Sequence, residues 1–301
     1  MIKKIVYCAI TLLFVVSSQI PLSEAYDVIA VKSAEISPYN QALEGFKDSC
    51  GCSITEIAYQ DMADSDLLIR IRKEGPDMVL AIGMDALRHV QPLTDIPIVY
   101  AMVPHSPRAA SAQKNISGVS MFIPPAKQLD TISGIFPNAR RIGIIYDPKN
   151  TEMVIREALR AAQAGAVELV VRKANRPGDV PALIDSLKDK IDVFWMLPDT
   201  TVVSSETINH LLLFSFQNKV PVFTFTNKYV AMGAVASLNI IPYDLGRQAG
   251  EMGRRLISDK TSNSPVRVDA RNTELTINKK VAKKLGIAIR DEILGRANDV
   301  N

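Results

Sequence analysis

Polar side chains gather in six short loops, each of which follows a hydrophobic segment that we interpret as a β-strand. The loops read KSAEISP, GMDA, VPHSP, DPKNT, PDTTV and TNKY and cover residues 32–38, 83–86, 103–107, 147–151, 198–202 and 226–229. Ser, Thr, Asn and Asp are typical helix caps, and a helix N-terminus suits a carboxylate or another anionic group. Turn and cap chemistry explains any single loop. Six loops in corresponding places favour a ligand-binding cleft at the carboxyl ends of parallel strands.

The motifs of common enzyme classes are absent from the sequence. It contains no G-x-S-x-G and no G-x-x-x-x-G-K-[ST], and no G-x-G-x-x-G follows the first predicted strand of either half. His89 and His210 lie in predicted helices, whereas His105 lies in a predicted cleft loop and can contact a ligand. Three aspartates in separate loops can form an acid pair or receive a ligand ammonium group: Asp85, Asp147 and Asp199. We expect a binding protein with no catalytic residue, no cofactor and no metal.

Two cysteines, Cys50 and Cys52, lie close together near the end of a predicted helix. A disulfide between them closes a very small ring, so the spacing argues only weakly for a bridge. A metal site needs further ligands, which the neighbouring sequence does not supply. The favoured interpretation is two small residues at a helix end, and a redox pair is the remaining alternative.

Strands and helices alternate along most of the chain, and this alternation predicts parallel sheets covered by helices on both faces. The predicted strands are 27–31, 53–59, 77–82, 97–102, 141–146, 167–172, 192–197 and 221–225. The predicted helices are 39–48, 65–74, 84–91, 150–165, 178–189, 204–218, 245–258 and 278–285.

The two halves of the chain resemble each other. The segment DMVLA begins a strand at Asp77 as DVFWM does at Asp192, and each leads to a second strand that opens with a proline, Pro97 or Pro221. This repetition predicts two Rossmann-like lobes. Segments 118–126, 237–242 and 266–277 serve as three connections that form a hinge. We expect one lobe over 26–121 plus 242–270 and a second over 122–241 plus 271–301.

The N-terminus has the pattern of an export signal. Lys3 and Lys4 precede an apolar stretch over 5–16, and Ser23 and Ala25 stand where a signal peptidase reads small residues. We expect cleavage near Ala25 and a periplasmic protein without a lipid anchor. The chain is 47% hydrophobic with a formal net charge of +3. This balance, with no run of five or more like charges, argues against nucleic acid as a partner.

Several segments resemble a known family. They read WMLPDTTVV (195–203), KVPVFTF (219–225), GAVAS (233–237), PYDLGRQA (242–249) and DIPIVYAMVP (95–104). Together they resemble the ABC-transporter substrate-binding proteins related to the tryptophan- and tyrosine-binding TrpX type, over about residues 27–289. The resemblance implies an α/β type I periplasmic-binding fold with three crossings between the lobes. It also implies a small-molecule ligand and an ABC permease in the inner membrane as partners, and we expect a monomer.

The resemblance also implies site residues. In the family an Asn-Ser pair often holds a ligand carboxylate, and Asn150 and Thr151 stand at that place here. The family often has Asp-Pro after the Ile-Pro-Ile-Val strand, where this chain has His105, Ser106 and Pro107. We expect Asp199 or Asp85 to bind an ammonium group. The full set of candidate ligand-binding residues is Ser33, Asp85, His105, Tyr146, Asn150, Thr151, Asp199, Thr200, Thr226 and Tyr243. Tyr39 and Phe122 are further aromatics that can flank a ring.

These observations predict a periplasmic receptor that closes on an amino acid, aromatic ligands included, and passes it to a permease. Two alternatives remain from the sequence. One is an exported α/β hydrolase-like enzyme, and the other is a ligand sensor without a transporter. A sugar-repressor type of regulator shares the fold, but no helix-turn-helix precedes Tyr26.

Overall fold

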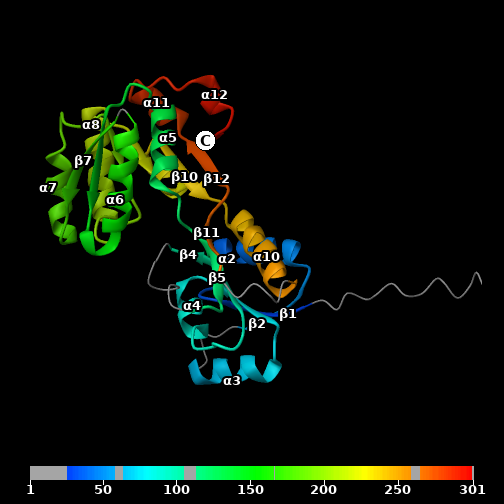
Figure 1. Cartoon of the computed structure of the whole chain (residues 1–301). Coiled ribbons are helices and arrows are strands. Elements are labelled where there is room, and N and C mark those ends of the chain that lie inside the picture. Colours follow the sequence, from blue (N-terminus) through cyan, green and yellow to red (C-terminus); the bar gives the residue numbers. More distant parts are fainter. Residues whose placement is uncertain (1–25, 58–63, 105–112, 166, 259–264, 300–301) are drawn as a thin grey trace, which may run out of the picture.

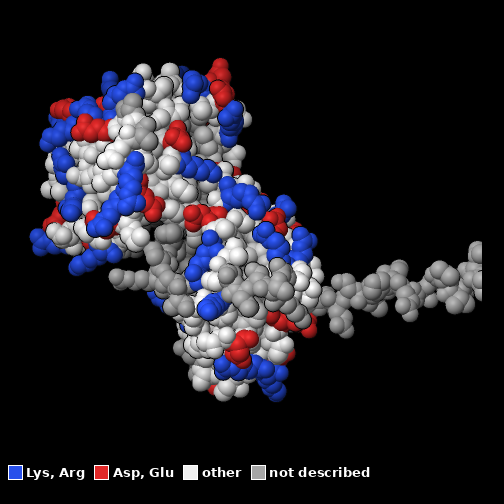
Figure 2. All heavy atoms as spheres, in the orientation of Figure 1, with Lys and Arg blue, Asp and Glu red and all other residues white. Residues whose placement is uncertain are grey.

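A computed structural model of the chain describes residues 26–57, 64–104, 113–165, 167–258 and 265–299. The predicted signal peptide and His105 lie outside these residues. Figure 1 shows the described chain as two α/β lobes, one above the other, with α10 and the β10–β12 pair near the junction. None of the described helices is both long enough and apolar enough to cross a bilayer. On the face drawn in Figure 2, basic and acidic side chains are interspersed over both lobes.

Lobe 1 is built on a six-stranded parallel sheet in the order β11-β5-β4-β3-β1-β2. Its strands are β1 (Asp27–Lys32), β2 (Ser53–Ile57), β3 (Met78–Ile82), β4 (Ile98–Val103), β5 (Ile116–Ser120) and β11 (Arg267–Asp269). One face packs against α2 (Ser37–Cys50) and α10 (Pro242–Ser258), and the other against α3 (Asp64–Glu74) and α4 (Met84–Val90). Every residue of β3 is therefore buried, as its continuous apolar run predicts.

Lobe 2 is built on a seven-stranded sheet in the order β13-β12-β10-β9-β8-β6-β7. Its strands are β6 (Arg141–Tyr146), β7 (Glu168–Lys173), β8 (Val193–Trp195), β9 (Val222–Thr224), β10 (Ala236–Ile240), β12 (Thr273–Ile277) and β13 (Asn298–Asp299). Helices α5 (Pro125–Ile135), α6 (Pro148–Ala164), α11 (Lys279–Lys284) and α12 (Asp291–Leu294) cover one face. The other face carries a 3-10 turn, η1 (Pro177–Asp179), and helices α7 (Val180–Asp185), α8 (Ser205–Asn218) and α9 (Asn227–Met232). Only the β10–β12 pair is antiparallel among these described strands.

The repeat in the sequence corresponds to a shared strand order. Lobe 1 has β2-β1-β3-β4-β5 where lobe 2 has β7-β6-β8-β9-β10. The aspartates that begin the two repeated segments, Asp77 and Asp192, also make equivalent hydrogen bonds. The carboxylate of Asp77 accepts from the backbone N–H of Asp27 at 2.9 Å, and that of Asp192 accepts from the N–H of Arg141 at 2.8 Å. Each aspartate therefore fixes the start of the strand next to its own.

The structure differs from the predicted elements in several places. Segment 118–126 is not one linker, because β5 occupies its first residues and α5 begins at Pro125. Segment 266–277 is broken into β11 and β12, which belong to different sheets. The helix predicted over 178–189 is shortened to η1 and α7. Helices α5, α9 and α12 and strand β13 were not predicted from the sequence, and most of segment 237–242, expected as a connection, belongs to strand β10.

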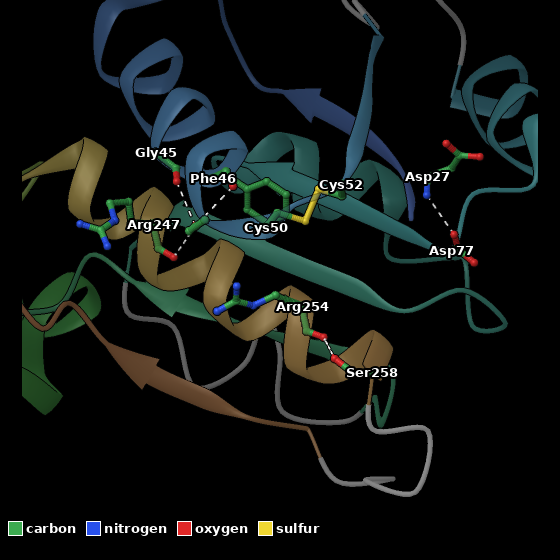
Figure 3. Close-up of a disulfide and its surroundings, with 10 residues drawn as sticks. Asp27, Gly45, Phe46, Cys50, Cys52, Asp77, Arg247, Arg254 and Ser258 are labelled. Atoms are coloured by element: carbon green, nitrogen blue, oxygen red, sulfur yellow. Dashed lines mark hydrogen bonds between the residues drawn. A yellow bond between two sulfur atoms is a disulfide. The ribbon is translucent and has the colours of Figure 1, made fainter. Parts of the chain in front are cut away.

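The spacing of Cys50 and Cys52 argues only weakly for a disulfide, but this structure joins them in one (Figure 3), so the interpretation as two unlinked small residues is wrong. Gly51 between them is the C-cap of α2 and has left-handed dihedral angles (φ 67°, ψ 35°). This reversal brings the two Cα atoms to 5.3 Å, within the ordinary range for a disulfide. Spacing alone does not reveal a glycine turn of this kind, which explains the error.

Helices α2 and α10 lie against each other through glycines. A Cβ built on Gly246 would lie 1.9 Å from the carbonyl oxygen of Ala42, and one built on Gly45 would lie 2.0 Å from that of Tyr243. Ser49 of α2 also donates to the carbonyl oxygen of Arg247 at 2.8 Å. The two backbones thus approach at distances that only glycine permits.

Candidate functional site

The carboxyl ends of β6 and β8 are joined by one buried carboxylate, that of Asp199. Asp199 has no exposed surface and accepts from five donors. The donors are the side chains of Asn150 (2.9 Å) and Thr151 (2.7 Å) and the backbone N–H groups of Asp147 (2.8 Å), Thr201 (2.9 Å) and Val202 (3.4 Å). A buried carboxylate needs such partners to remain charged. Asp199 therefore holds the two loops together.

Asp147 completes this arrangement from the other loop. It caps α6 by accepting from the backbone N–H of Lys149 at 2.9 Å, and it accepts from the hydroxyl of Thr201 at 2.7 Å. The hydrogen bonds from Thr201 and Lys149 hold the pKa of Asp147 below its usual value. Thr151, whose hydroxyl reaches Asp199, has non-helical dihedral angles inside α6 (φ −131°, ψ 15°).

Asn150 and Thr200 lie exposed at the surface of this loop pair. The Asn150 amide donates to the Thr200 hydroxyl at 3.2 Å and to the Thr201 hydroxyl at 3.1 Å, besides its bond to Asp199. Asn150 is thus oriented by the loop across from it, and its side-chain N–H groups already have acceptors in the protein.

Tyr146 ends β6 and is buried, with 2% of its surface exposed. Its hydroxyl donates to Glu152 of α6 at 2.8 Å. Burial, together with the hydrogen bond to Glu152 and its charge, raises the pKa of Tyr146 to about 12. The Tyr146 ring belongs to the core of lobe 2. Tyr146 is therefore part of the core beneath the loops that follow β6 and β8, and it packs against them from inside the lobe.

Lobe 1 has its own polar group at the carboxyl ends of β1 and β3. The Ser33 hydroxyl accepts from the backbone N–H of Ala86 at 2.9 Å. A Cβ built on Gly83 would lie 2.4 Å from the Ser33 hydroxyl and 2.8 Å from that of Tyr39, so both hydroxyls lie directly over this glycine. Burial and the negative charge of Asp85 raise the pKa of Tyr39. Asp85 itself is exposed and pairs with Arg88 at 3.3 Å.

Three of the predicted hydroxyl residues share one feature. Ser33 accepts from Ala86, Thr200 accepts from Asn150, and Thr226, the N-cap of α9, accepts from the backbone N–H of Lys228 at 3.4 Å. A hydroxyl that accepts a hydrogen bond keeps its own hydrogen to donate. These three side chains therefore present donors at the carboxyl ends of β1, β8 and β9.

The structure brings together Tyr146, Asn150, Thr151, Asp199 and Thr200 in lobe 2, and Ser33 and Asp85 in lobe 1. The role predicted for Asp199, to receive an ammonium group, does not fit a carboxylate that is fully buried and already has five donors. Tyr243 also does not join the other candidates, because its hydroxyl donates to Asp48 in the α2–α10 contact at 2.6 Å. His105 lies outside the described residues.

Sequence reasoning missed the roles of Asp147, Glu152 and Thr201 in this site. The signal for Asp147 is present, because an aspartate before a proline at the first helical position is a typical N-cap. Glu152 and Thr201 become visible only when α6 and the loop after β8 are placed together. The described part of the chain holds no cluster of three or more His, Cys, Asp or Glu side chains that could bind a metal ion.

Two lobes with the same parallel strand order, joined by several crossings and carrying donors at strand ends, define the type I periplasmic-binding class. Residues 44–301 match the family described as ABC transporter substrate binding protein, and the chain belongs to this family. It is accordingly a solute-binding protein and not an enzyme, and the resemblance seen in the sequence is confirmed.

Individual relatives agree with this assignment. A tyrosine-binding protein of Clostridioides difficile (strain R20291) is 28% identical over 258 residues, which are 81% of this chain and 74% of the relative. The ligand-free, open structure of a substrate-binding protein with adhesive properties from Clostridium difficile has a TM-score of 0.79 at 20% identity, covering 92% of this chain and 99% of that one. A complex with L-Trp from Streptococcus pneumonia has a TM-score of 0.63 at 21% identity, covering 92% and 100%. At these identities the solved structures show the shared fold.

Proposed function

We propose that this chain is the exported receptor of an ABC importer and that it closes on an aromatic amino acid. The lobes we propose are 26–121 plus 242–270 and 122–241 plus 271–301, after a signal peptide over 1–25. The ligand lies between the carboxyl ends of the strands of the two lobes, and its contacts with both favour the closed form. A permease in the inner membrane then receives it.

The observation that carries this proposal is the set of hydroxyl donors. Ser33, Thr200 and Thr226 each accept a hydrogen bond from the protein and so each keeps a hydrogen to donate. Hydroxyl donors at the ends of several strands suit a carboxylate. Since Asn150 and Asp199 are engaged with each other, the carboxylate is held by the Thr200 hydroxyl and the ammonium group by Asp85.

Tyr39 supports an aromatic ligand. Its ring is partly buried beside Ser33 and Gly83, and the charge of Asp85 acts on its hydroxyl. One face of lobe 1 thus combines an aromatic ring with a carboxylate, which suits the ring and the ammonium group of one molecule. The tyrosine-binding relative and the structural neighbour with L-Trp are consistent with this choice.

Isothermal titration calorimetry on the purified mature chain tests the proposal. L-Tyrosine and L-tryptophan are compared with tyramine and tryptamine, which lack the carboxylate, and with their N-acetyl derivatives, which lack the ammonium group. We expect binding of at least one aromatic amino acid and a loss of about a hundredfold in affinity for both kinds of analogue, since each removes a charged hydrogen-bonding group. Equal binding of the amino acid and its amine would contradict the carboxylate site.

Ribose serves as the second ligand class in the same titration, because a structure described as a periplasmic ribose ABC transporter from Conexibacter woesei shares the fold at a TM-score of 0.58. Binding of the sugar without binding of any amino acid would replace the proposed ligand while leaving the receptor function in place.

A further inference from the structure

Lys32, the last residue of β1, is a lysine that the protein almost encloses. Only 8% of its surface is exposed, although lysine is among the residues least often buried. It immediately precedes Ser33, which we propose as a donor to the ligand. A buried ammonium group keeps its charge only where it has partners, so those partners indicate what Lys32 does.

The ammonium group of Lys32 joins three parts of lobe 1. Its Nζ donates to the carboxylate of Glu35, in the loop after β1, at 2.9 Å and to the side-chain oxygen of Asn40, near the start of α2, at 2.9 Å. It also pairs with Glu56 of β2 at 3.1 Å. The loop, the helix start and the neighbouring strand are thus all bound to the charged group at the end of β1.

The charges around Lys32 favour its protonated form. Burial acts against a charged lysine, but the hydrogen bonds and charges of Glu35 and Glu56 outweigh it and raise the pKa of Lys32. The hydrogen bond from Lys47 of α2, reinforced by Lys32, lowers the pKa of Glu56 despite its partial burial. Lys32 therefore holds its partners at neutral pH through charge-assisted hydrogen bonds, which are the strong ones.

Helix α2 has no side-chain cap of its own at its start. Its N-cap is Ile36, whose side chain cannot accept a hydrogen bond from the first turn. Glu35 precedes this N-cap and Asn40 follows it, and both are bound to Lys32. The contacts of Lys32 therefore fix the start of α2, where Tyr39 lies, from the strand beneath it.

The same loop also reaches α4. The N-cap of α4 is Gly83, which has no side chain to cap the helix, and the Ser33 hydroxyl accepts from the backbone N–H of Ala86 at 2.9 Å. This N–H lies in the first turn, where a helix has no acceptor for it. Ser33 thus supplies the missing cap, and the Ala86 N–H reports where the Ser33 side chain lies.

We propose that Lys32 is a positioning residue for the ligand site, and that its ammonium group holds the loop after β1 in the form in which Ser33 caps α4 and keeps a hydrogen for the ligand. Asp85, in the first turn of α4, is placed by the same contacts. Lys32 itself makes no ligand contact in this proposal, because its ammonium group is engaged with side chains of lobe 1. The inference rests on the proposed function, which supplies the reason for holding Ser33 in place.

Lys32→Met tests the proposal, because methionine keeps an apolar stem and removes the ammonium group. The carboxylates that it leaves, Glu35 and Glu56, have side chains that are 60% and 41% exposed, so water can solvate them. Lys47→Met is the matched control. It removes the other ammonium group bound to Glu56 and leaves the contacts of Lys32 with the loop and with α2 intact.

Hydrogen exchange measured by NMR reads the position of Ser33 without any ligand. We expect exchange of the Ala86 N–H about tenfold faster in Lys32→Met and unchanged in Lys47→Met. Exchange at Leu80, which is buried in β3 between two neighbouring strands, should stay the same in both variants. Wild-type exchange at Ala86 in Lys32→Met would overturn the proposal. Faster exchange at both Ala86 and Leu80 would do so too, because it would assign Lys32 to overall stability.

Glu35→Ala carries the test if Lys32→Met does not fold. The Glu35 side chain is exposed, and its loss leaves the pair between Lys32 and Glu56 in place. This variant should also speed exchange at Ala86, by a smaller factor because the contact between Lys32 and Asn40 remains. Unchanged exchange at Ala86 in this variant would contradict the role of Lys32 in holding the loop.

A double-mutant cycle on ligand affinity gives an independent readout. Titration calorimetry with the aromatic amino acid that the wild type binds should show about tenfold weaker binding for Lys32→Met and for Ser33→Ala. The two changes together should also cost about tenfold, because both act on the same contact to the ligand. Losses that multiply to about a hundredfold would show that Lys32 affects binding by a route other than Ser33, and would overturn the proposal.

The outcome is separate from that of the ligand proposal. A chain that binds no amino acid but exchanges faster at Ala86 in Lys32→Met loses its proposed ligand, while Lys32 keeps its role in holding Ser33. A chain that binds an amino acid and shows unchanged exchange at Ala86 in Lys32→Met keeps its ligand, and Lys32 loses that role.

Discussion

Two kinds of polar side chain occur at the carboxyl ends of the strands, and they have different uses. The carboxylates of Asp147 and Asp199 are buried and receive all their donors from the protein, so they set the shape of the loops. The hydroxyls of Ser33, Thr200 and Thr226 accept once and keep a hydrogen to donate. Ligand contacts are therefore expected from the hydroxyls, supported by the carboxylates beneath them.

Asp199→Asn is expected to destabilise the fold itself. The amide introduces N–H groups where Thr151 and several backbone N–H groups donate, and a hydrogen bond to a buried charged group contributes about 1.5–3 kcal/mol. Urea unfolding should show a loss of at least about 2 kcal/mol in the free energy of unfolding. Asp85→Asn, at an exposed carboxylate, is the control and should leave stability unchanged within about 0.5 kcal/mol.

Tyr146 should make stability depend on pH on the alkaline side. Its pKa is raised to about 12 in the folded protein, above the value near 10 of an unfolded tyrosine. Between these values the unfolded chain releases a proton that the folded chain keeps, so raising the pH favours unfolding. The stability that Tyr146 contributes is thus full below pH 10 and is lost as the pH rises towards 12.

Tyr146→Phe removes this dependence. Urea midpoints measured from pH 9 to 11.5 should fall more steeply for the wild type than for the variant. Parallel curves for the two proteins would show that the Tyr146 hydroxyl titrates normally.

At the scale of elements, the contact between α2 and α10 depends on the absence of side chains. Gly246 and Gly250 bring α10 onto the backbone of α2, and a Cβ at either would lie within 2.2 Å of an atom of that helix. Gln248 on α10 also bonds the backbone at Asp269 and Arg271, so the position of α10 affects the segment between β11 and β12 as well.

Gly246→Ala is expected to lower the free energy of unfolding by about 3 kcal/mol or more, because the overlap is with backbone that cannot move aside. Gly178→Ala is the matched control. A Cβ there meets no atom within 4 Å, so its stability should equal that of the wild type or exceed it slightly. Thermal unfolding of both variants, measured in parallel, tests this prediction. Equal melting temperatures would contradict the close contact.

The bridge between Cys50 and Cys52 should contribute little to stability despite its place at the end of α2. Its loop spans a sequence separation of only 2 residues, and the chain-entropy model gives about 1.6 kcal/mol for so short a loop. Reduction with a phosphine should therefore lower the free energy of unfolding by no more than about 2 kcal/mol. Global unfolding on reduction would show that the disulfide stabilises the whole fold and not only the turn at the end of α2.

At the scale of the whole molecule, a ligand on which the lobes close should stabilise the fold by an amount that grows with the logarithm of its concentration above the dissociation constant. A ligand at a hundred times its dissociation constant adds about 2.7 kcal/mol to the free energy of unfolding. We expect the aromatic amino acid identified by calorimetry to raise the melting temperature of the wild type accordingly. It should also reduce the radius of gyration measured by small-angle X-ray scattering.

Thr200→Val should lower the affinity for the ligand about tenfold, because it removes a hydrogen-bond donor while keeping the shape of the side chain. The increase in melting temperature at a given ligand concentration should be smaller as a result. The hydrogen bond from Asn150 to Thr200 is also lost in this variant, so Thr200→Ser, which keeps the hydroxyl both as an acceptor for Asn150 and as a donor, is the control. A ligand shift that is lost equally in both variants would assign the effect to the loop and not to the Thr200 hydroxyl.

Much of the architecture could be predicted from the sequence, because its signals are local. Apolar runs such as MVLAI and RIGIIY predict buried strands, and the structure has β3 and β6 there. The echo of DMVLA in DVFWM predicts two similar lobes, and Asp77 and Asp192 indeed bind equivalent backbone groups. Helix α5 was missed because a Pro-Pro pair at its start reads as an extended linker, although proline also suits the first turn of a helix.

The sequence did not allow a prediction of which polar residues of the site are structural and which can contact a ligand. Asp85 and Asp199 follow equivalent strands and carry the same functional group, yet one is exposed and the other is enclosed by donors from two loops. The type and order of residues along the chain determined the strands, the helices, the repeat and the loops that carry polar groups. Only the tertiary structure decided which of those polar groups hydrogen-bond to one another and which keep a donor for a ligand. The reason is that the hydrogen bonds join loops about 50 residues apart, so they depend on which strands lie side by side.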